Sequence, residues 1–287
     1  EGLSSVPCRL EHSLWYRSPE PYVGKRVLII GGGFSGIDIA REVARTAEEV
    51  LLSCYTPVRL YSEANLSDPD AKLAQQCREP VHFDSDGTCY TADGQEFQPD
   101  VIICCTGYQY HYPFLPDGLV DCSENYVKPL FQQLVHCQHP TLAFVGLQFR
   151  IIPFPLFQTQ AQFLAALWSG QMPCPSTEEM EADRLSYEVF VTEKLGLPRR
   201  KMHLLSERMW DYCRGLAQRM GLLHREKQFW SEQVNVYREI YEDTSARRKE
   251  NPDEYRRTQY VLKTPSRKAS PAWQAQSDQE TISEEFQ

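Results

Sequence analysis

The sequence predicts an α/β fold: a parallel sheet with a crossover helix, followed by a mostly helical C-terminal part. Three observations support this. An apolar run at residues 26–31 leads into a glycine-rich stretch and then into a helical pattern. A second apolar run follows at residues 50–53. Beyond residue 157 the apolar residues recur at the spacing typical of helices. Strand, helix and strand within about thirty residues form a βαβ unit, which favours parallel pairing.

The βαβ unit begins with the strand at residues 26–31. Val27 to Ile30 are all apolar, which is typical of a strand buried on both faces, so we expect it near the centre of the sheet. The helix at residues 35–47 follows. It places apolar residues on one face and charged residues on the other.

The middle of the chain predicts mixed elements. Residues 71–77 favour a short helix that Pro80 would stop. Residues 82–97 contain two Asp-Gly turns between short alternating segments, which predicts β-hairpins inserted beside the parallel sheet. Residues 100–105 predict a buried strand, and residues 142–147 repeat the pattern of a strand that ends at a glycine.

The C-terminal part predicts helices at residues 155–170, 176–196 and 206–221, each ending at a glycine. The tail at residues 263–287 is polar and rich in Ser, Gln and Glu. Such a composition buries too little apolar surface to fold, so the tail is predicted to be disordered.

The glycine-rich stretch at residues 31–36 satisfies G-x-G-x-x-G between a strand and a helix. In this setting Gly31 permits the tight turn, Gly33 lets a pyrophosphate approach the backbone, and Gly36 allows close packing of helix and strand. The free N–H groups at the start of the helix, where Phe34 and Ser35 lie, favour an anion. We therefore predict a Rossmann-like dinucleotide-binding domain; the alternative is a tight turn without a ligand.

The end of the second strand indicates which dinucleotide is bound. An acidic residue there would hold the ribose hydroxyls of NAD, but residues 52–56, which include Tyr55, contain no carboxylate. The missing acid permits a 2′-phosphate, so NADP(H) is favoured over NAD and over FAD at this loop. Arg59 is the nearest cation that could reach the phosphate, and a solvent-facing arginine is the alternative reading.

Composition excludes several classes. The net charge of −9 argues against nucleic acid as a partner, because binding the phosphate backbone needs clustered Lys and Arg. No apolar stretch is long enough to span a membrane. The ten cysteines show no disulfide spacing, which favours a reducing compartment. The polar C-terminal tail holds no membrane segment, so a soluble, cytoplasmic protein is expected. No metal site is predicted, since the pair His136 and His139 has no second pair of ligands.

The chain lacks the sequence motifs of several enzyme classes. The chain has no Tyr-x-x-x-Lys pair of short-chain dehydrogenases and no cysteine pair at the C-x-x-C or C-x4-C spacing of flavin disulfide reductases. It also has no G-x-S-x-G or H-E-x-x-H motif of hydrolases and zincins. The adjacent Cys104 and Cys105 lie in an apolar strand, where inert thiols are expected.

Several segments together resemble the flavin-containing monooxygenases. His12 and Ser13 before the glycine loop are similar to the H-S of the family signature F-x-G-x-x-x-H-S. Residues 105–108 (CTGY) and 112–115 (YPFL) resemble the family's ATGY and FPFL segments. Later segments resemble the arthropod branch that includes senecionine N-oxygenase: HPTLAFVGL, PFPLFQTQAQF, EEMEAD and IYEDTSARRKENPDEYRRTQY. The resemblance extends over residues 1–262.

The resemblance implies a domain organisation. Residues 1–23 would be a linker from an FAD-binding segment, residues 24–110 an NADP-binding domain, and residues 111–262 the C-terminal part of an FAD domain. Family members carry an earlier G-x-G-x-x-G for FAD, and this chain, which begins with Glu rather than Met, has no second such loop. We therefore expect the chain to be a fragment.

The resemblance also implies a reaction. NADPH would reduce FAD, oxygen would form a C4a-hydroperoxyflavin, and a tertiary amine or sulfide would take up one oxygen atom. No catalytic side chain is predicted, because the cofactor carries the chemistry. Thr106 and Gly107 would lie where the two dinucleotide units meet. The alternative for Thr106 is a cap at the end of a strand.

The chain departs from the family pattern at several positions. Val6 and Cys8 stand at the Phe and Gly of F-x-G, and Phe34 stands where Asn is common. Gln158 replaces the family's usual Glu, and the usual basic residue after the second strand is absent. Two alternatives to a monooxygenase therefore stay open. One is a noncatalytic NADP(H)-binding module or sensor, and the other is a pyridine-nucleotide oxidoreductase of another flavoprotein family.

Overall fold

The structure, a computed structural model, describes residues 2–3, 6–68, 71–221, 227–251, 254–262 and 273–276. The chain forms two compact units. Unit 1 comprises residues 1–108, 243–260 and 275–287, and unit 2 comprises residues 109–242 and 261–274. The sequence did not indicate that residues 243–260 belong with the first hundred. The part of the predicted disordered tail other than residues 273–276 lies outside the described residues.

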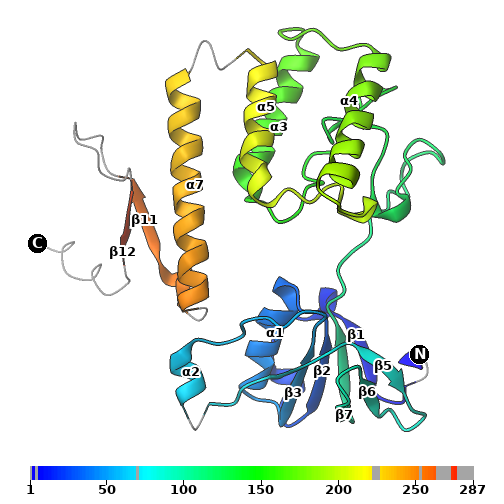
Figure 1. The fold of residues 1–287 in the computed structure, drawn as a ribbon, viewed down its shortest axis with the longest axis vertical. Helices are drawn as coiled ribbons and strands as arrows, with labels where there is room; N and C mark the ends of the chain where they lie inside the picture. Colours follow the sequence, from blue (N-terminus) through cyan, green and yellow to red (C-terminus); the bar gives the residue numbers. More distant parts are fainter. Residues whose placement is uncertain are drawn as a thin grey trace, which may run out of the picture. The chain divides into compact units, whose positions relative to one another are not determined.

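Unit 1 is built on a five-stranded parallel sheet in the order β1-β8-β2-β3-β4 (Figure 1). Its strands are β1 (Arg9–His12), β2 (Arg26–Ile30), β3 (Glu49–Ser53), β4 (Gln75–Cys77) and β8 (Val101–Cys104). The apolar run of β2 is central, as the sequence predicted, and its three middle residues are buried. The predicted α/β fold is thus confirmed.

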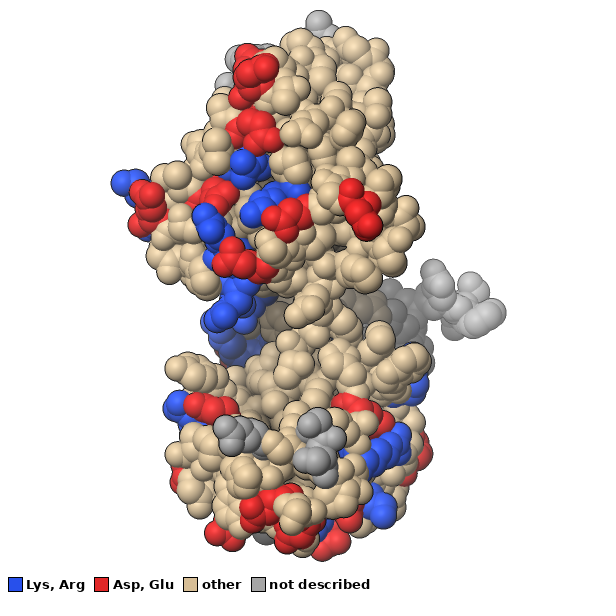
Figure 2. Space-filling model, turned by 90° about the vertical axis from the view of Figure 1, so that its right-hand side faces the viewer, with Lys and Arg blue, Asp and Glu red and all other residues tan. Residues whose placement is uncertain are grey.

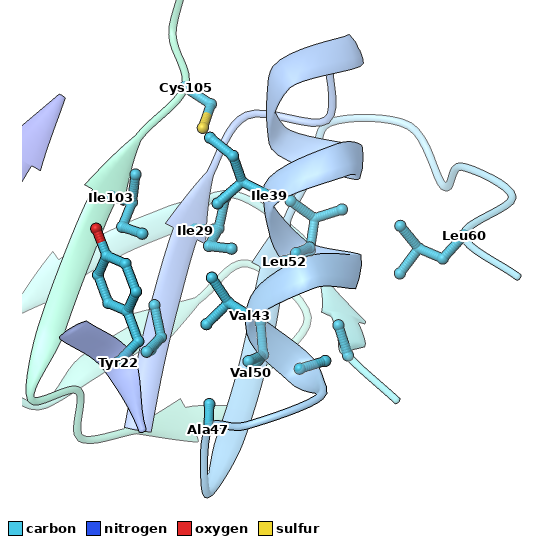
Figure 3. Close-up of a cluster of buried hydrophobic side chains, with 14 of the residues drawn as sticks. Tyr22, Ile29, Ile39, Val43, Ala47, Val50, Leu52, Leu60, Ile103 and Cys105 are labelled. Atoms are coloured by element: carbon cyan, nitrogen blue, oxygen red, sulfur yellow. The ribbon is translucent and has the colours of Figure 1, made fainter. Parts of the chain in front are cut away.

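Helix α1 (Phe34–Ala44) covers one face of this sheet. Figure 3 shows Ile39 and Val43 of the helix meeting Ile29 and Leu52 of the strands. These four side chains are at most 6% exposed. Burial of apolar area of this kind is the main stabilising term in folding, and it fixes the helix against the strand that precedes it.

A second, three-stranded antiparallel sheet holds the predicted hairpins. It consists of β5 (Pro80–Phe83), β6 (Cys89–Thr91) and β7 (Glu96–Phe97). Phe83, Cys89 and Phe97 pack with Leu28 and Ile102, so the hairpins cover the other face of the parallel sheet. The short helix α2 (Glu63–Ser67) completes this part.

Unit 2 is mainly helical. It contains β9 (Leu130–Phe131), β10 (Val135–His136), α3 (Pro153–Trp168), α4 (Thr177–Val189) with a π-helical turn at Phe190–Lys194, and α5 (Met209–Arg219). Helix α7 (Lys227–Glu250) begins in this unit, and its last residues belong to unit 1. Strands β11 (Gln259–Leu262) and β12 (Trp273–Gln276) form a two-stranded sheet.

Two sequence predictions are wrong. Residues 75–77, expected in a helix, form β4, because parallel pairing with β3 overrides the local preference of Ala, Lys, Leu and Gln for a helix. Residues 142–147, expected as a strand, form turns with one isolated bridge between Ala143 and Val135. Gly146 takes a positive φ of 83° there, which bends the chain.

Candidate dinucleotide-binding site

The five parallel strands end in one row. The register aligns His12 with Cys104, Cys104 with Ile30, Ile30 with Ser53, and Ser53 with Cys77. The residues that follow these strand ends therefore share the carboxyl edge of the sheet, the edge where α/β sheets bind ligands.

The first and third glycines of the loop are required by packing. Gly31 has a φ of +117°, and a Cβ there would lie 2.5 Å from the carbonyl oxygen of Cys105. A Cβ on Gly36 would lie 1.8 Å from the carbonyl oxygen of Gly31. Only glycine therefore lets α1 start this close to β2 and β8.

The second glycine faces open space. A Cβ on Gly33 would meet no heavy atom within 4 Å, and its φ of −76° suits any residue. No described side chain caps the helix at Gly33, and its first turn carries no acid. Phe34 and Ser35 are exposed beside it. The start of α1 therefore has no capping side chain among the described residues, and the space beside Gly33 is open, which fits a diphosphate bound by the backbone N–H groups.

Residues 243–260 contribute cations to the start of α1, and the sequence analysis missed them. The guanidinium carbon of Arg248 lies 4.4 Å from the centroid of the Phe34 ring. Asp38 pairs with Arg256 at 2.7 Å and with Arg248 at 3.8 Å. More than 200 residues separate Arg248 from Phe34, so no local sequence pattern could have indicated this contact.

The turn after β3 is held by a side chain of β4. Gln76 donates from Nε2 to the carbonyl of Val58 at 2.9 Å and accepts at Oε1 from the Val58 N–H at 2.9 Å. Tyr55, at the tip of this turn, is 76% exposed. Arg59 is exposed, and its Nε donates to the carbonyl of Tyr61 at 3.4 Å. A Cβ on Gly32 would lie 2.6 Å from the Cβ of Cys54, so this turn packs against the glycine loop.

Thr106 and Gly107 follow β8 at the same edge, and both are exposed. His12 accepts at Nδ1 from the N–H of Leu14, so its Nε2 carries the proton and donates to the carbonyl of Gly107 at 3.2 Å. The His12 ring also meets the Tyr108 ring edge-on at 5.2 Å. His12 therefore fixes the path of the chain after β8.

The thiols at this edge are unreactive by environment. Burial raises the pKa of Cys105 to about 11 and also raises the pKa of Cys104. Both therefore stay protonated near neutral pH, which fits the interpretation as core thiols. Among the described residues, no cluster of three or more His, Cys, Asp or Glu side chains is arranged to hold a metal ion.

The described part of the chain contains no helix that is long and apolar enough to cross a bilayer. On the face drawn in Figure 2, acidic and basic side chains are interspersed in each unit. This mixture gives no broad basic surface on that face.

Comparison with known proteins places the chain in a family. The family model described as flavin-binding monooxygenase-like matches residues 1–64 and 80–221. Flavin-containing monooxygenase FMO GS-OX-like 3 of Arabidopsis thaliana is 31% identical over 264 residues, which are 89% of this chain and 54% of that protein. FMO GS-OX5 of the same plant is 34% identical over 77% of this chain and 48% of its own length.

Solved structures share the fold. S-allyl-L-cysteine S-oxygenase from Allium sativum matches with a TM-score of 0.74 and 32% identity, over 89% of this chain and 56% of that chain. Tmm from Pelagibacter sp. strain HTCC7211 matches with a TM-score of 0.66 at 22% identity, over 91% of this chain and 55% of its own, which shows a common fold. The chain thus spans about half the length of the relatives it matches.

Proposed function

Since this chain belongs to the flavin-binding monooxygenase-like family, we propose that it forms the NADPH-binding part of an FAD- and NADPH-dependent monooxygenase. The observation that carries the proposal is the open space at Gly33, beside the uncapped first turn of α1. When bound, NADPH supplies a hydride and FAD supplies the oxygen chemistry. The task of this chain is to hold and orient the coenzyme.

Each part of the carboxyl edge has a role in this proposal. The N–H groups at Gly33, Phe34 and Ser35 would bind the diphosphate, because the first N–H groups of a helix have no hydrogen-bond partner within it and no described side chain caps α1. Gly31 and Gly36 would set the position of that turn. Thr106 and Gly107, held by His12, would border the nicotinamide end.

The proposed substrates are small soft nucleophiles with nitrogen or sulfur, together with oxygen. The Allium relative is named for S-oxygenation of a sulfide, which supports the sulfur side. Tertiary amines, and a place in the arthropod branch that includes senecionine N-oxygenase, stay predictions from the sequence resemblance. A cytoplasmic location belongs to the same proposal, and the ten free cysteines support it.

A second candidate is a noncatalytic NADP(H)-binding module, and the single G-x-G-x-x-G loop favours it. Flavin content separates the two. The experiment uses the purified 287-residue chain and measures its NADPH affinity and its content of bound flavin. It also measures the consumption of NADPH in the presence of oxygen and a tertiary amine or a sulfide. Turnover with retained FAD supports the monooxygenase in this chain. If the chain binds NADPH without FAD, turnover belongs to a longer protein or the chain is a noncatalytic module. If the chain does not bind NADPH, the monooxygenase and the module are both contradicted.

A further inference from the structure

The carboxyl edge carries a second arginine that sequence reasoning did not consider. Arg78 directly follows β4 at the carboxyl edge of the sheet. Gly31 and Cys54 follow the neighbouring strands β2 and β3, so Arg78 comes after Cys54 in this order. The carbonyl of Arg78 accepts a hydrogen bond from Ser53 Oγ at 3.1 Å, which ties its backbone to β3. Its guanidinium carbon lies 5.3 Å from the centroid of the Tyr55 ring.

This position corresponds to the ribose end of a dinucleotide. In a Rossmann-like unit the pyrophosphate lies at the loop after the first strand, and the adenosine ribose lies at the end of the second strand. Here these two strands are β2 and β3, and β4 is the next strand outward. A cation after β4 therefore stands beside the ribose, at the place where NADP(H) carries its extra phosphate.

We propose that Arg78, held over the ring of Tyr55, binds the 2′-phosphate of the coenzyme and makes the site prefer NADPH to NADH. This inference rests on the proposed function, because it needs the dinucleotide at the glycine loop. It replaces Arg59 as the phosphate anchor. The guanidinium of Arg59 donates instead to the backbone of its own turn.

Two carboxylates lie near Arg78. Glu79 pairs with its Nε at 3.3 Å, and the two side chains are 41% and 43% exposed. An exposed pair of this kind is weak, so a phosphate dianion, which accepts bidentate hydrogen bonds from arginine, competes with it. Asp93 is already bonded through its carboxylate to Thr91 Oγ1 and to the N–H of Arg78.

Tyr55 acts as a positioning residue. The turn that carries it is fixed by the two hydrogen bonds between Gln76 and Val58, so the ring is presented on a rigid support. A guanidinium stacked on an aromatic ring loses less freedom when it binds a phosphate than one free in solvent. The aromatic ring matters here, and its hydroxyl does not.

The test measures the dissociation constants of 2′,5′-ADP and 5′-AMP, which differ only in the 2′-phosphate, for the full 287-residue chain. We expect the unchanged chain to prefer 2′,5′-ADP. Arg78→Ala is expected to weaken 2′,5′-ADP about tenfold or more and to leave 5′-AMP unchanged, since a charge-assisted bond is lost. Tyr55→Ser is expected to weaken 2′,5′-ADP by a smaller factor, and Tyr55→Phe to restore it.

Arg26, the first residue of β2, offers a matched control at the amino ends of the strands. Its Nε pairs with Glu49 at 3.2 Å, and its guanidinium carbon lies 4.8 Å from the centroid of the Phe97 ring. Arg26→Ala removes the same kinds of contact away from the glycine loop, so both affinities are expected to stay unchanged.

The outcomes separate the two proposals. If the unchanged chain binds neither nucleotide, the dinucleotide site itself is wrong. If it binds both nucleotides equally, the dinucleotide site stands and Arg78 is not the phosphate anchor. The same conclusion follows if it prefers 5′-AMP and loses that preference with Glu79→Gln. The anchor is also overturned if Arg59→Ala, and not Arg78→Ala, abolishes the preference for 2′,5′-ADP.

Discussion

At the residue scale, the three glycines of the G-x-G-x-x-G motif have different physical reasons to be glycine. A side chain at Gly31 or Gly36 would clash with the protein backbone, whereas a side chain at Gly33 would extend into open space. A side chain at Gly33 should therefore disturb a ligand without disturbing the fold, and this difference makes its role testable.

We expect Gly33→Val to weaken NADPH binding at least tenfold, equivalent to about 1.4 kcal/mol, because the side chain would keep the diphosphate off the backbone. Isothermal titration calorimetry would give the dissociation constant, and a thermal melt would show that the protein remains folded. Gly215→Val is the control, since Gly215 in α5 also has an ordinary φ and no heavy atom within 4 Å of an added Cβ. Unchanged NADPH affinity in Gly33→Val would remove the loop from the site.

The site was only partly predictable because its residues are of two kinds. The glycines form a contiguous pattern whose spacing carries the prediction. Arg78 follows β4 beside the turn after β3, whereas Arg248 and Arg256 reach the start of α1 from residues 243–260. Their proximity depends on strand register and on contacts between distant segments, which no local pattern contains.

At the element scale, burial decides which strands the sequence could predict. β2 and β8 are central and read as uninterrupted apolar runs. β1 and β4 are the outermost strands of the sheet, and their residues are partly exposed. Their sequences, RLEH and QQC, therefore lack such an apolar run. β1 was therefore hidden in the predicted linker, and β4 in the predicted helix.

The loops of unit 2 are joined by a buried histidine. His203 is 1% exposed and accepts at Nε2 from the N–H of Val127 at 3.1 Å, so Nδ1 carries the proton and donates to Oε1 of Gln133 at 3.0 Å. Tyr110 and Tyr126 pack against its ring. This environment holds a neutral imidazole, and burial lowers the pKa of His203 from 6.5 to about 4.

We expect unit 2 to lose stability as the pH falls through this range. A proton binds the unfolded chain near pH 6.5 but the folded chain only near pH 4, so the stabilisation is fully present above pH 6.5 and is lost between these values. The loss would reach about 3 kcal/mol, since a pKa difference of one corresponds to about 1.4 kcal/mol. Urea denaturation at several pH values would measure it.

His203→Gln should flatten this pH dependence, because glutamine does not titrate. The exposed His82, which pairs with Asp84 in the hairpin sheet, provides the control variant His82→Gln. A pH profile in which His203→Gln is as steep as the unchanged chain would show that other groups govern the acid sensitivity.

At the scale of the whole molecule, each unit has its own buried core. In unit 1 the sheet packs on α1 and on the hairpins, whereas in unit 2 the helices α3 and α5 pack together with the loops around β9. Residues 243–260 join unit 1 through the ion pairs of Asp38 with Arg248 and Arg256. The contact of Arg248 with the Phe34 ring adds to them. A ligand at the glycine loop should therefore stabilise both the sheet of unit 1 and residues 243–260.

We expect NADPH at about a hundred times its dissociation constant to slow hydrogen exchange of the most protected amides in β2 and β8 about a hundredfold, corresponding to about 2.7 kcal/mol. Peptides from residues 243–260 should gain protection with them, whereas the core of α3 should not. Asp38→Asn removes both ion pairs but leaves the contact of Arg248 with Phe34, so it should reduce the gain in residues 243–260 while β2 and β8 keep theirs. Equal protection in both units would show that they unfold together, and protection confined to α3 and α5 would place the coenzyme in unit 2.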